Sequence, residues 1–218
     1  LTCGAGARVD PDKCIACLTC VRVCPFEVPG VDRGTAEVPV DYCQACGLCA
    51  TECPAKAITM TLQSDEGVLR QVKLAIMRAR SGGEPGIVGF ACRYCAYSGE
   101  SPEVVKAALP ANVQVIDVLC SGKVDALYLL KAFEYGADGV FVAGCIVGEC
   151  HNDKGNVHAG QRVAYVKKML DDLGLNGARL EMFNTPPGEC ASLVEDVTRL
   201  ASKVKELGAS PVQPGRSN

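Results

Sequence analysis

The residues most suited to chemistry are two copies of one cysteine string, C-x2-C-x2-C-x3-C-P. The first copy contains Cys14, Cys17, Cys20 and Cys24, and the second contains Cys43, Cys46, Cys49 and Cys53. A [4Fe-4S] cubane needs four thiolates directed at the corners of a tetrahedron, and a tight loop with a cysteine at every third position can supply three of them. Pro25 and Pro54 fix the backbone directly after each fourth cysteine. Zinc, the alternative metal, is usually held by two separated C-x2-C pairs and has no use for a third cysteine at the same gap.

The spacing also predicts which cysteines share a cluster. It resembles that of bacterial two-cluster ferredoxins, in which three cysteines of one string and the fourth of the other hold each cubane. We therefore predict an α+β two-cluster ferredoxin domain over residues 1–62, closed by a strand at Ile58–Met60. The predicted ligands are Cys14, Cys17, Cys20 and Cys53 for one [4Fe-4S] cluster, and Cys43, Cys46, Cys49 and Cys24 for the other.

Composition favours free thiols. The chain has 15 cysteines among 218 residues, and clusters need free thiolates, so a disulfide framework is disfavoured. Cys3, ahead of the first string, is either a spare thiol or a ligand to a centre that another chain completes.

The sequence contains no signal for secretion or for membrane insertion. Residues 1–10 have no basic region followed by an apolar core, and Gly139–Gly148, the longest apolar stretch, is about half the length of a membrane-spanning helix. We expect a cytoplasmic protein of anaerobic metabolism, without direct membrane insertion. The net charge of −3 gives no reason to expect nucleic-acid binding.

After residue 62 the apolar pattern predicts a second domain. Ser64 can cap a helix with acidic residues in its first turn, and residues 63–83 are expected to form this linker helix. The short apolar runs expected to be buried strands are Gly86–Ala91, Val113–Leu119, Gly139–Ala143 and Arg179–Phe183. The amphipathic segments expected to be helices are Pro102–Leu109, Val124–Tyr135, Val157–Leu173 and Gly188–Leu207. This alternation predicts an α/β, flavodoxin-like domain with a small parallel sheet over residues 84–208, followed by a flexible tail at 209–218.

Five further cysteines follow the predicted strands of this second domain: Cys92, Cys95, Cys120, Cys145 and Cys150. The carboxyl ends of parallel strands lie along one edge of a sheet, so these thiols are expected to converge on a metal or redox site there. Two alternatives stay open. Cysteine is often simply a small buried residue. A C-x2-C pair after a strand, here Cys92 and Cys95, is also the signature of a thioredoxin-type dithiol.

Several motifs in series resemble the delta subunit of methyl-viologen-reducing hydrogenase. They are Phe90–Gly99, Cys120–Asp125, Gly136–Val140 and Ala143–His151. The resemblance implies a [2Fe-2S] cluster whose iron is held by four of Cys92, Cys95, Cys120, Cys145 and Cys150. It also implies electron transfer, within a hetero-oligomeric complex, between a hydrogenase or formate dehydrogenase and a heterodisulfide reductase A-like flavoprotein. The two-cubane domain in front is similar to fused forms of this family.

Other polar residues receive smaller roles. Lys123 stands where the family usually has arginine, and Ile146 where histidine is common; both are expected to affect partner contacts rather than a cluster. His151 is expected to donate to a bound group or to face solvent, and His158 to be structural. Cys190 has no partner motif and is expected to fill space in the core.

Two functions fit these observations. The first is a non-catalytic electron-transfer subunit between the redox proteins named above, with a quinone-interacting complex as a variant. The second is a ferredoxin-fed reductase in which Cys92 and Cys95 reduce a disulfide or sulfur substrate. Iron content separates them, because about ten iron atoms per chain favour the first and about eight favour the second. The sequence has no Walker loop, dinucleotide fingerprint or Ser/His/Asp set that would indicate nucleotide binding or hydrolysis.

Overall fold

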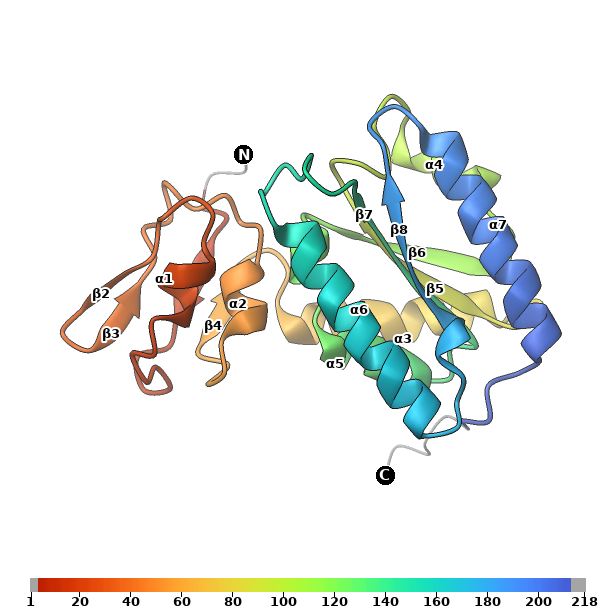
Figure 1. Ribbon diagram of the computed structural model, residues 1–218, viewed down its shortest axis with the longest axis horizontal. Helices are drawn as coiled ribbons and strands as arrows, with labels where there is room; N and C mark the ends of the chain where they lie inside the picture. The colour runs from red at the N-terminus through yellow and green to blue at the C-terminus, as the bar shows by residue number, and fades with distance from the viewer. Residues whose placement is uncertain (1–3, 213–218) are drawn as a thin grey trace.

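The computed structural model describes residues 4–212 of the chain (Figure 1). Its N-terminal part is built from short elements. Two antiparallel strand pairs are present: β1 (Ala7–Val9) with β4 (Ile58–Met60), and β2 (Gly30–Asp32) with β3 (Thr35–Glu37). Two helices follow the three-cysteine loops and pack against each other: α1 (Thr19–Val23) and α2 (Leu48–Glu52). The strand predicted at Ile58–Met60 is confirmed.

The second part contains a four-stranded parallel sheet. Its strands are β5 (Ile87–Cys92), β6 (Val113–Val118), β7 (Gly139–Cys145) and β8 (Leu180–Thr185). They lie side by side in the order β6-β5-β7-β8. The central strands β5 and β7 are buried along their whole length, which is why they read as continuous apolar runs in the sequence. All four predicted strands are confirmed, and so is the α/β class; the flavodoxin-like classification stays a prediction.

Helices cover both faces of this sheet (Figure 1). One face packs against α3 (Asp65–Ala79), α5 (Ala126–Glu134) and α6 (Gly155–Asp172). The other packs against α4 (Pro102–Ala108) and α7 (Cys190–Leu207). Two short 3-10 turns, η1 (Ser121–Lys123) and η2 (Gly177–Arg179), precede α5 and β8. The predicted helices are therefore present.

Helix α3 does more than join the two parts. The Ser64 hydroxyl accepts a hydrogen bond from the Gly67 amide at 3.2 Å, as expected of a capping residue. One face of the helix, which carries Val68, Val72 and Ile76, is buried in the same core cluster as Phe90 of β5. The segment predicted to be a linker helix therefore belongs to the core of the second domain.

Within residues 4–212, no helix is long and apolar enough to cross a lipid bilayer. The flexible tail predicted for residues 209–218 lies, from residue 213 onward, outside the described residues, and so does Cys3. Figure 1 shows the ferredoxin part beside the second domain, with α2 facing the side of the sheet that α6 covers.

Candidate metal centres

The eight cysteines of the two strings separate into two groups around two small cavities. The residues around the first cavity include Cys14, Cys17, Cys20 and Cys53. Those around the second include Cys24, Cys43, Cys46 and Cys49. Each group takes three cysteines from one string and one from the other. This grouping has the geometry that crossed ligation requires; the ligation itself stays a prediction.

The two cysteine loops repeat the same uncommon backbone conformation. Ala16 and Leu18 have φ angles of 52° and 61°, and their counterparts Ala45 and Gly47 have 54° and 78°. Residues other than glycine rarely adopt positive φ, and such strained residues concentrate at ligand-binding sites. The repeat therefore extends from the spacing of the cysteines to the shape of the loops.

Backbone donors and burial act on the thiols of these cavities. At the first cavity the Ala36 amide donates to Cys14 Sγ at 3.4 Å, and the Ala57 amide donates to Cys53 Sγ at 3.3 Å. Hydrogen bonds to ligand sulfurs tune the reduction potential of an iron–sulfur cluster. At the second cavity, burial raises the pKa of Cys46 to about 11 and also raises the pKa of Cys49. Metal binding there would release protons, because thiol ligands bind deprotonated.

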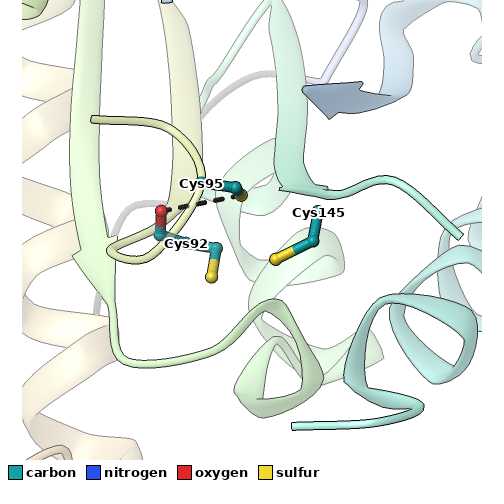
Figure 2. A group of neighbouring side chains, drawn as sticks. All are labelled: Cys92, Cys95 and Cys145. Carbon is teal, nitrogen blue, oxygen red and sulfur yellow. Dashed lines mark hydrogen bonds between the residues drawn. The ribbon is translucent and has the colours of Figure 1, made fainter. Parts of the chain in front are cut away.

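The five cysteines that follow the strands meet at one edge of the parallel sheet. The sulfur atoms of Cys92, Cys95 and Cys145 lie within 4.8 Å of one another, and all three residues are buried (Figure 2). Cys150 packs against this group and also against the buried cluster that contains Cys120. These five residues are called the sheet-edge set below. They come from the ends of β5 and β7 and from the loops that follow β5, β6 and β7.

Hydrogen bonds between sulfurs shift the acidity of the sheet-edge set in opposite directions. Bonds from Cys120, Cys145 and Cys95 hold the pKa of Cys92 below its usual value. The pKa of Cys145 is also lowered, mainly by its bond with Cys150. The pKa of Cys95 is raised, mainly by its bond with Cys145, and that of Cys120 is raised mainly by its bond with Cys150. The acidities of Cys92, Cys95, Cys120 and Cys145 thus depend on neighbouring thiols, and thiolates are the form in which cysteine binds metal.

The surroundings of Cys120 also fit a bound metal–sulfur group. The Gly122 amide donates to Cys120 Sγ at 3.3 Å. A Cβ atom on Gly155 would lie 2.5 Å from that sulfur, so a larger residue would displace it. The buried hydroxyl of Ser121 has no hydrogen-bond partner among residues 4–212. An unpartnered buried polar atom calls for an explanation such as an additional bound group, and the five thiols match iron in character.

The remaining predicted residues take these places. His151 is exposed and stacks on Tyr94, with ring centroids 3.8 Å apart. His158 Nδ1 lies 3.2 Å from Glu52 Oε1, which fits the structural role predicted for it. Cys190 is buried, as expected of a core residue, and its thiol donates to the Ser98 carbonyl at 2.9 Å.

Lys123, where the departure from the family's arginine was expected to affect partner contacts, is buried. Its side chain is only 2% exposed, so a partner protein cannot reach it. The ammonium group points inward, 2.5 Å from Asp65 Oδ1 and 2.6 Å from the Tyr128 hydroxyl. A buried ammonium needs such partners. No local pattern in the sequence indicates this contact, because Asp65 belongs to a distant segment of the chain.

Sequence reasoning also missed a contact between the second cavity and the sheet-edge set. Cys46, Leu48 and Cys120 form one buried cluster, and Val23 and Cys150 pack against it. Candidate ligands of two different centres are therefore neighbours in one core. No local pattern could have indicated this, because Cys46 and Cys120 belong to different domains.

Comparison with known proteins agrees with this geometry. The family model described as methyl-viologen-reducing hydrogenase, delta subunit, matches residues 87–208. The chain belongs to this family. A second model, a 4Fe-4S dicluster domain, matches residues 7–54. A dicluster ferredoxin domain thus precedes the part of the chain that matches the delta-subunit family, as the motifs predicted.

The relatives fall into two kinds. The first kind includes a ferredoxin:CoB-CoM heterodisulfide reductase protein of Methanosarcina mazei, 39% identical over 204 residues, which cover 93% of this chain and 26% of that protein. The second includes the vhu iron-sulfur subunit of F420-non-reducing hydrogenase from Methanococcus maripaludis, 40% identical over 131 residues, 60% of this chain and 98% of that protein. The F420-non-reducing hydrogenase iron-sulfur subunit of Archaeoglobus profundus is 33% identical over 126 residues, 57% of this chain and 92% of that protein.

The two kinds differ in how much of the relative is matched. The chain spans 26% and 27% of two heterodisulfide reductase relatives. By contrast, its match to the hydrogenase iron-sulfur subunits covers nearly the whole of each of them. The chain therefore corresponds to a part of the longer relatives and contains a counterpart of the shorter ones.

Proposed function

We propose that the chain is a non-catalytic iron–sulfur electron-transfer unit of a multi-subunit oxidoreductase. The cysteines around the first and second cavities would each hold a [4Fe-4S] cluster, and four of the sheet-edge set would hold a [2Fe-2S] cluster. Bound clusters of these kinds supply one-electron transfer. The main observation in favour of the proposal is the buried cluster of Cys46, Leu48 and Cys120, because it brings candidate ligands of two centres into one core.

The protein's own residues would keep the second cavity and the sheet-edge set close together and shielded from water. Leu48 is 1% exposed and Cys120 is 1% exposed, so the contact between the two sites lies away from solvent. Exclusion of water strengthens every electrostatic interaction near a bound cluster. The ferredoxin domain and the sheet edge can therefore act as one electron-transfer unit rather than as two separate carriers.

Exposed apolar side chains beside the thiols support docking by partners. In the first string, Ile15 is 65% exposed and Leu18 is 46% exposed; in the sheet-edge loops, Tyr94 is 45% exposed and Val147 is 74% exposed. Exposed apolar groups that gather at a functional site are typical of protein contact surfaces. We infer one docking surface beside the first string and another beside the sheet-edge set.

The relatives indicate the kind of partner. Their names describe subunits of hydrogenases and of heterodisulfide reductases. We propose by analogy that one partner belongs to a hydrogenase or formate dehydrogenase and that the other is a heterodisulfide reductase A-like flavoprotein. The assembly would be a hetero-oligomeric complex.

Burial argues against the dithiol reductase. A thiolate that attacks an external disulfide must be reachable. Cys92 and Cys95 are each 1% exposed, so a disulfide substrate would have to displace the surrounding loops to reach either sulfur. Of the sheet-edge set only Cys150 is partly exposed, and it lies outside the C-x2-C pair.

The strand order supports the flavodoxin-like classification, which we propose for the second domain. When the four strands are numbered 1 to 4 along the chain, their order across the sheet is 2-1-3-4. The flavodoxin-like order begins in the same way. Ligands of such sheets bind at the carboxyl ends of the strands. The sheet-edge set occupies that place.

Iron analysis and EPR spectroscopy of the anaerobically purified chain test the proposed function. We expect about ten iron atoms per chain, and a spin-half [2Fe-2S] signal beside the cubane signals after reduction. Replacing both Cys92 and Cys145 with alanine leaves only three of the five thiols, so this double variant should lose the [2Fe-2S] signal, and its iron content should fall to about eight atoms. Cys190→Ala, a matched change at a buried cysteine outside the sheet-edge set, should leave both unchanged. A wild-type chain with about eight iron atoms and no [2Fe-2S] signal would contradict the proposal.

A further inference from the structure

Lys123 lies between the loop of the second cysteine string and the sheet-edge set. We propose that it is a positioning residue for electron transfer, whose side chain holds that loop at a fixed place relative to Cys120. This inference rests on the proposed function, because it assumes that clusters occupy both sites.

The backbone of Lys123 is tied to one of the two centres. Lys123 ends the 3-10 turn η1, which begins directly after Cys120. Its amide donates to the Cys120 carbonyl at 3.0 Å, and the preceding amide, that of Gly122, donates to Cys120 Sγ at 3.3 Å. The turn therefore fixes Lys123 and the Cys120 sulfur with respect to each other.

The aliphatic part of the Lys123 side chain lies on the loop of the other centre. A Cβ atom on Gly47 would be 2.6 Å from Lys123 Cδ and 3.0 Å from its Cβ, so the glycine backbone and the lysine stem are in close contact. Gly47 follows Cys46 directly and precedes α2, which carries Cys49. Its φ of +78° is one that glycine adopts without strain. The stem thus covers the turn between two candidate ligands of the second cavity.

The charged end of Lys123 is anchored to the second domain. Its ammonium group lies 2.5 Å from Asp65 Oδ1 in α3 and donates to the Tyr128 hydroxyl in α5 at 2.6 Å. The Tyr128 hydroxyl in turn donates to Asp65 Oδ1 at 2.5 Å. A buried ammonium without such partners would be strongly destabilising. These partners allow the charged end to be buried, while the stem itself packs against Gly47.

Electron tunnelling between two centres falls steeply as their separation grows. The packing of the Lys123 stem on Gly47 sets how closely the second string approaches Cys120. The aliphatic stem, rather than the charge, makes this contact. Shortening the Lys123 side chain should therefore allow the second string to move away from Cys120. Removing only the charge should leave their separation unchanged.

The experiment compares Lys123→Ala with Lys123→Met in the full, reduced chain. A paramagnetic cubane close to a [2Fe-2S] cluster speeds the relaxation of its EPR signal, so the microwave power at half-saturation reports their approach. Lys123→Ala should lower this power several-fold, with unchanged iron content. Lys123→Met, which keeps a stem of similar length without the charge, should restore the wild-type value. Lys203→Ala, at an exposed lysine of α7 away from the contact, is the matched control and should change nothing.

The outcomes separate this inference from the proposed function. If Lys123→Ala fails to assemble its clusters, Lys123→Val provides a milder shortening. If a variant with a shortened side chain at position 123 keeps its full iron content and the wild-type microwave power at half-saturation, the role of Lys123 is overturned. The proposed function would remain intact. An equal loss in Lys123→Met would overturn the role of the stem. A wild-type chain without a [2Fe-2S] signal would overturn both.

Discussion

Arg162 of α6 lies 2.6 Å from Glu52 of α2 and forms an ion pair between the second domain and the ferredoxin domain. The same guanidinium donates to the Thr51 hydroxyl at 2.9 Å, and to the carbonyls of Gly122 and Val124 at 3.0 and 2.8 Å. Charge-assisted bonds of this kind are stronger than neutral ones. Arg162 therefore links α2 of the ferredoxin domain to the backbone on both sides of Lys123.

Loss of this guanidinium should destabilise the protein. We expect Arg162→Met to lower the free energy of unfolding by about 1–3 kcal/mol, because a half-buried carboxylate and two carbonyls lose their donor. Anaerobic chemical denaturation followed by circular dichroism measures the change. Arg199→Met is the matched control, since Arg199 is exposed and pairs with Asp196 within α7. It should change the stability by less than about 0.5 kcal/mol. If Arg162→Met lowers the free energy of unfolding no more than Arg199→Met does, the interdomain bonds of Arg162 do not stabilise the protein.

The stabilisation from this pair should disappear in acid. Burial alone would raise the pKa of Glu52, but its hydrogen bond to Arg162 and the charges of Arg162 and His158 bring it below the ordinary value of 4.5. A carboxyl group whose pKa is lower in the folded state contributes stability above its unfolded pKa, and this stability is lost as the pH falls through the folded pKa. The difference in stability between wild type and Arg162→Met should therefore be constant near neutral pH and shrink below 4.5. A difference that grows in acid would contradict this.

The crossed ligation can be tested at the two fourth cysteines. Cys24 lies with Cys43, Cys46 and Cys49 around the second cavity, next to the sheet-edge set. Cys24→Ala should damage the cubane there and so slow the relaxation of the [2Fe-2S] signal. Cys53→Ala should damage the other cubane and leave that relaxation largely unchanged. The reverse result would show that each string holds its own cluster.

A fragment that contains the second domain should need helix α3. Val68, Val72 and Ile76 of this helix are 1%, 0% and 3% exposed, and each such side chain contributes roughly 1.5–3 kcal/mol by burial. Their combined loss is comparable with the whole stability of a domain, about 5–15 kcal/mol. We expect a fragment that begins at Ser64 to unfold cooperatively and one that begins at Gly83 to be digested rapidly by protease. Cooperative unfolding of the shorter fragment would show that α3 is only a linker.

The sequence by itself determined the cysteine groups and the order of elements. Three cysteines at equal gaps must share one loop, because the chain between them is too short to separate them. The helix after Ser64 and the buried strands β5 and β7 were also predictable. Their signals, a capping residue and continuous apolar runs, act over a few neighbouring residues.

Only the tertiary structure decided how the two domains meet. A lysine is normally expected at the surface, but Lys123 is buried. Its charge can be buried because Asp65 and Tyr128 bind the ammonium group. The buried cluster that contains Cys46 and Cys120 likewise brings together residues that are far apart in the sequence. Such contacts depend on the packing of segments that are far apart in the chain, and the identity of each residue alone carries no information about which distant segment will cover it.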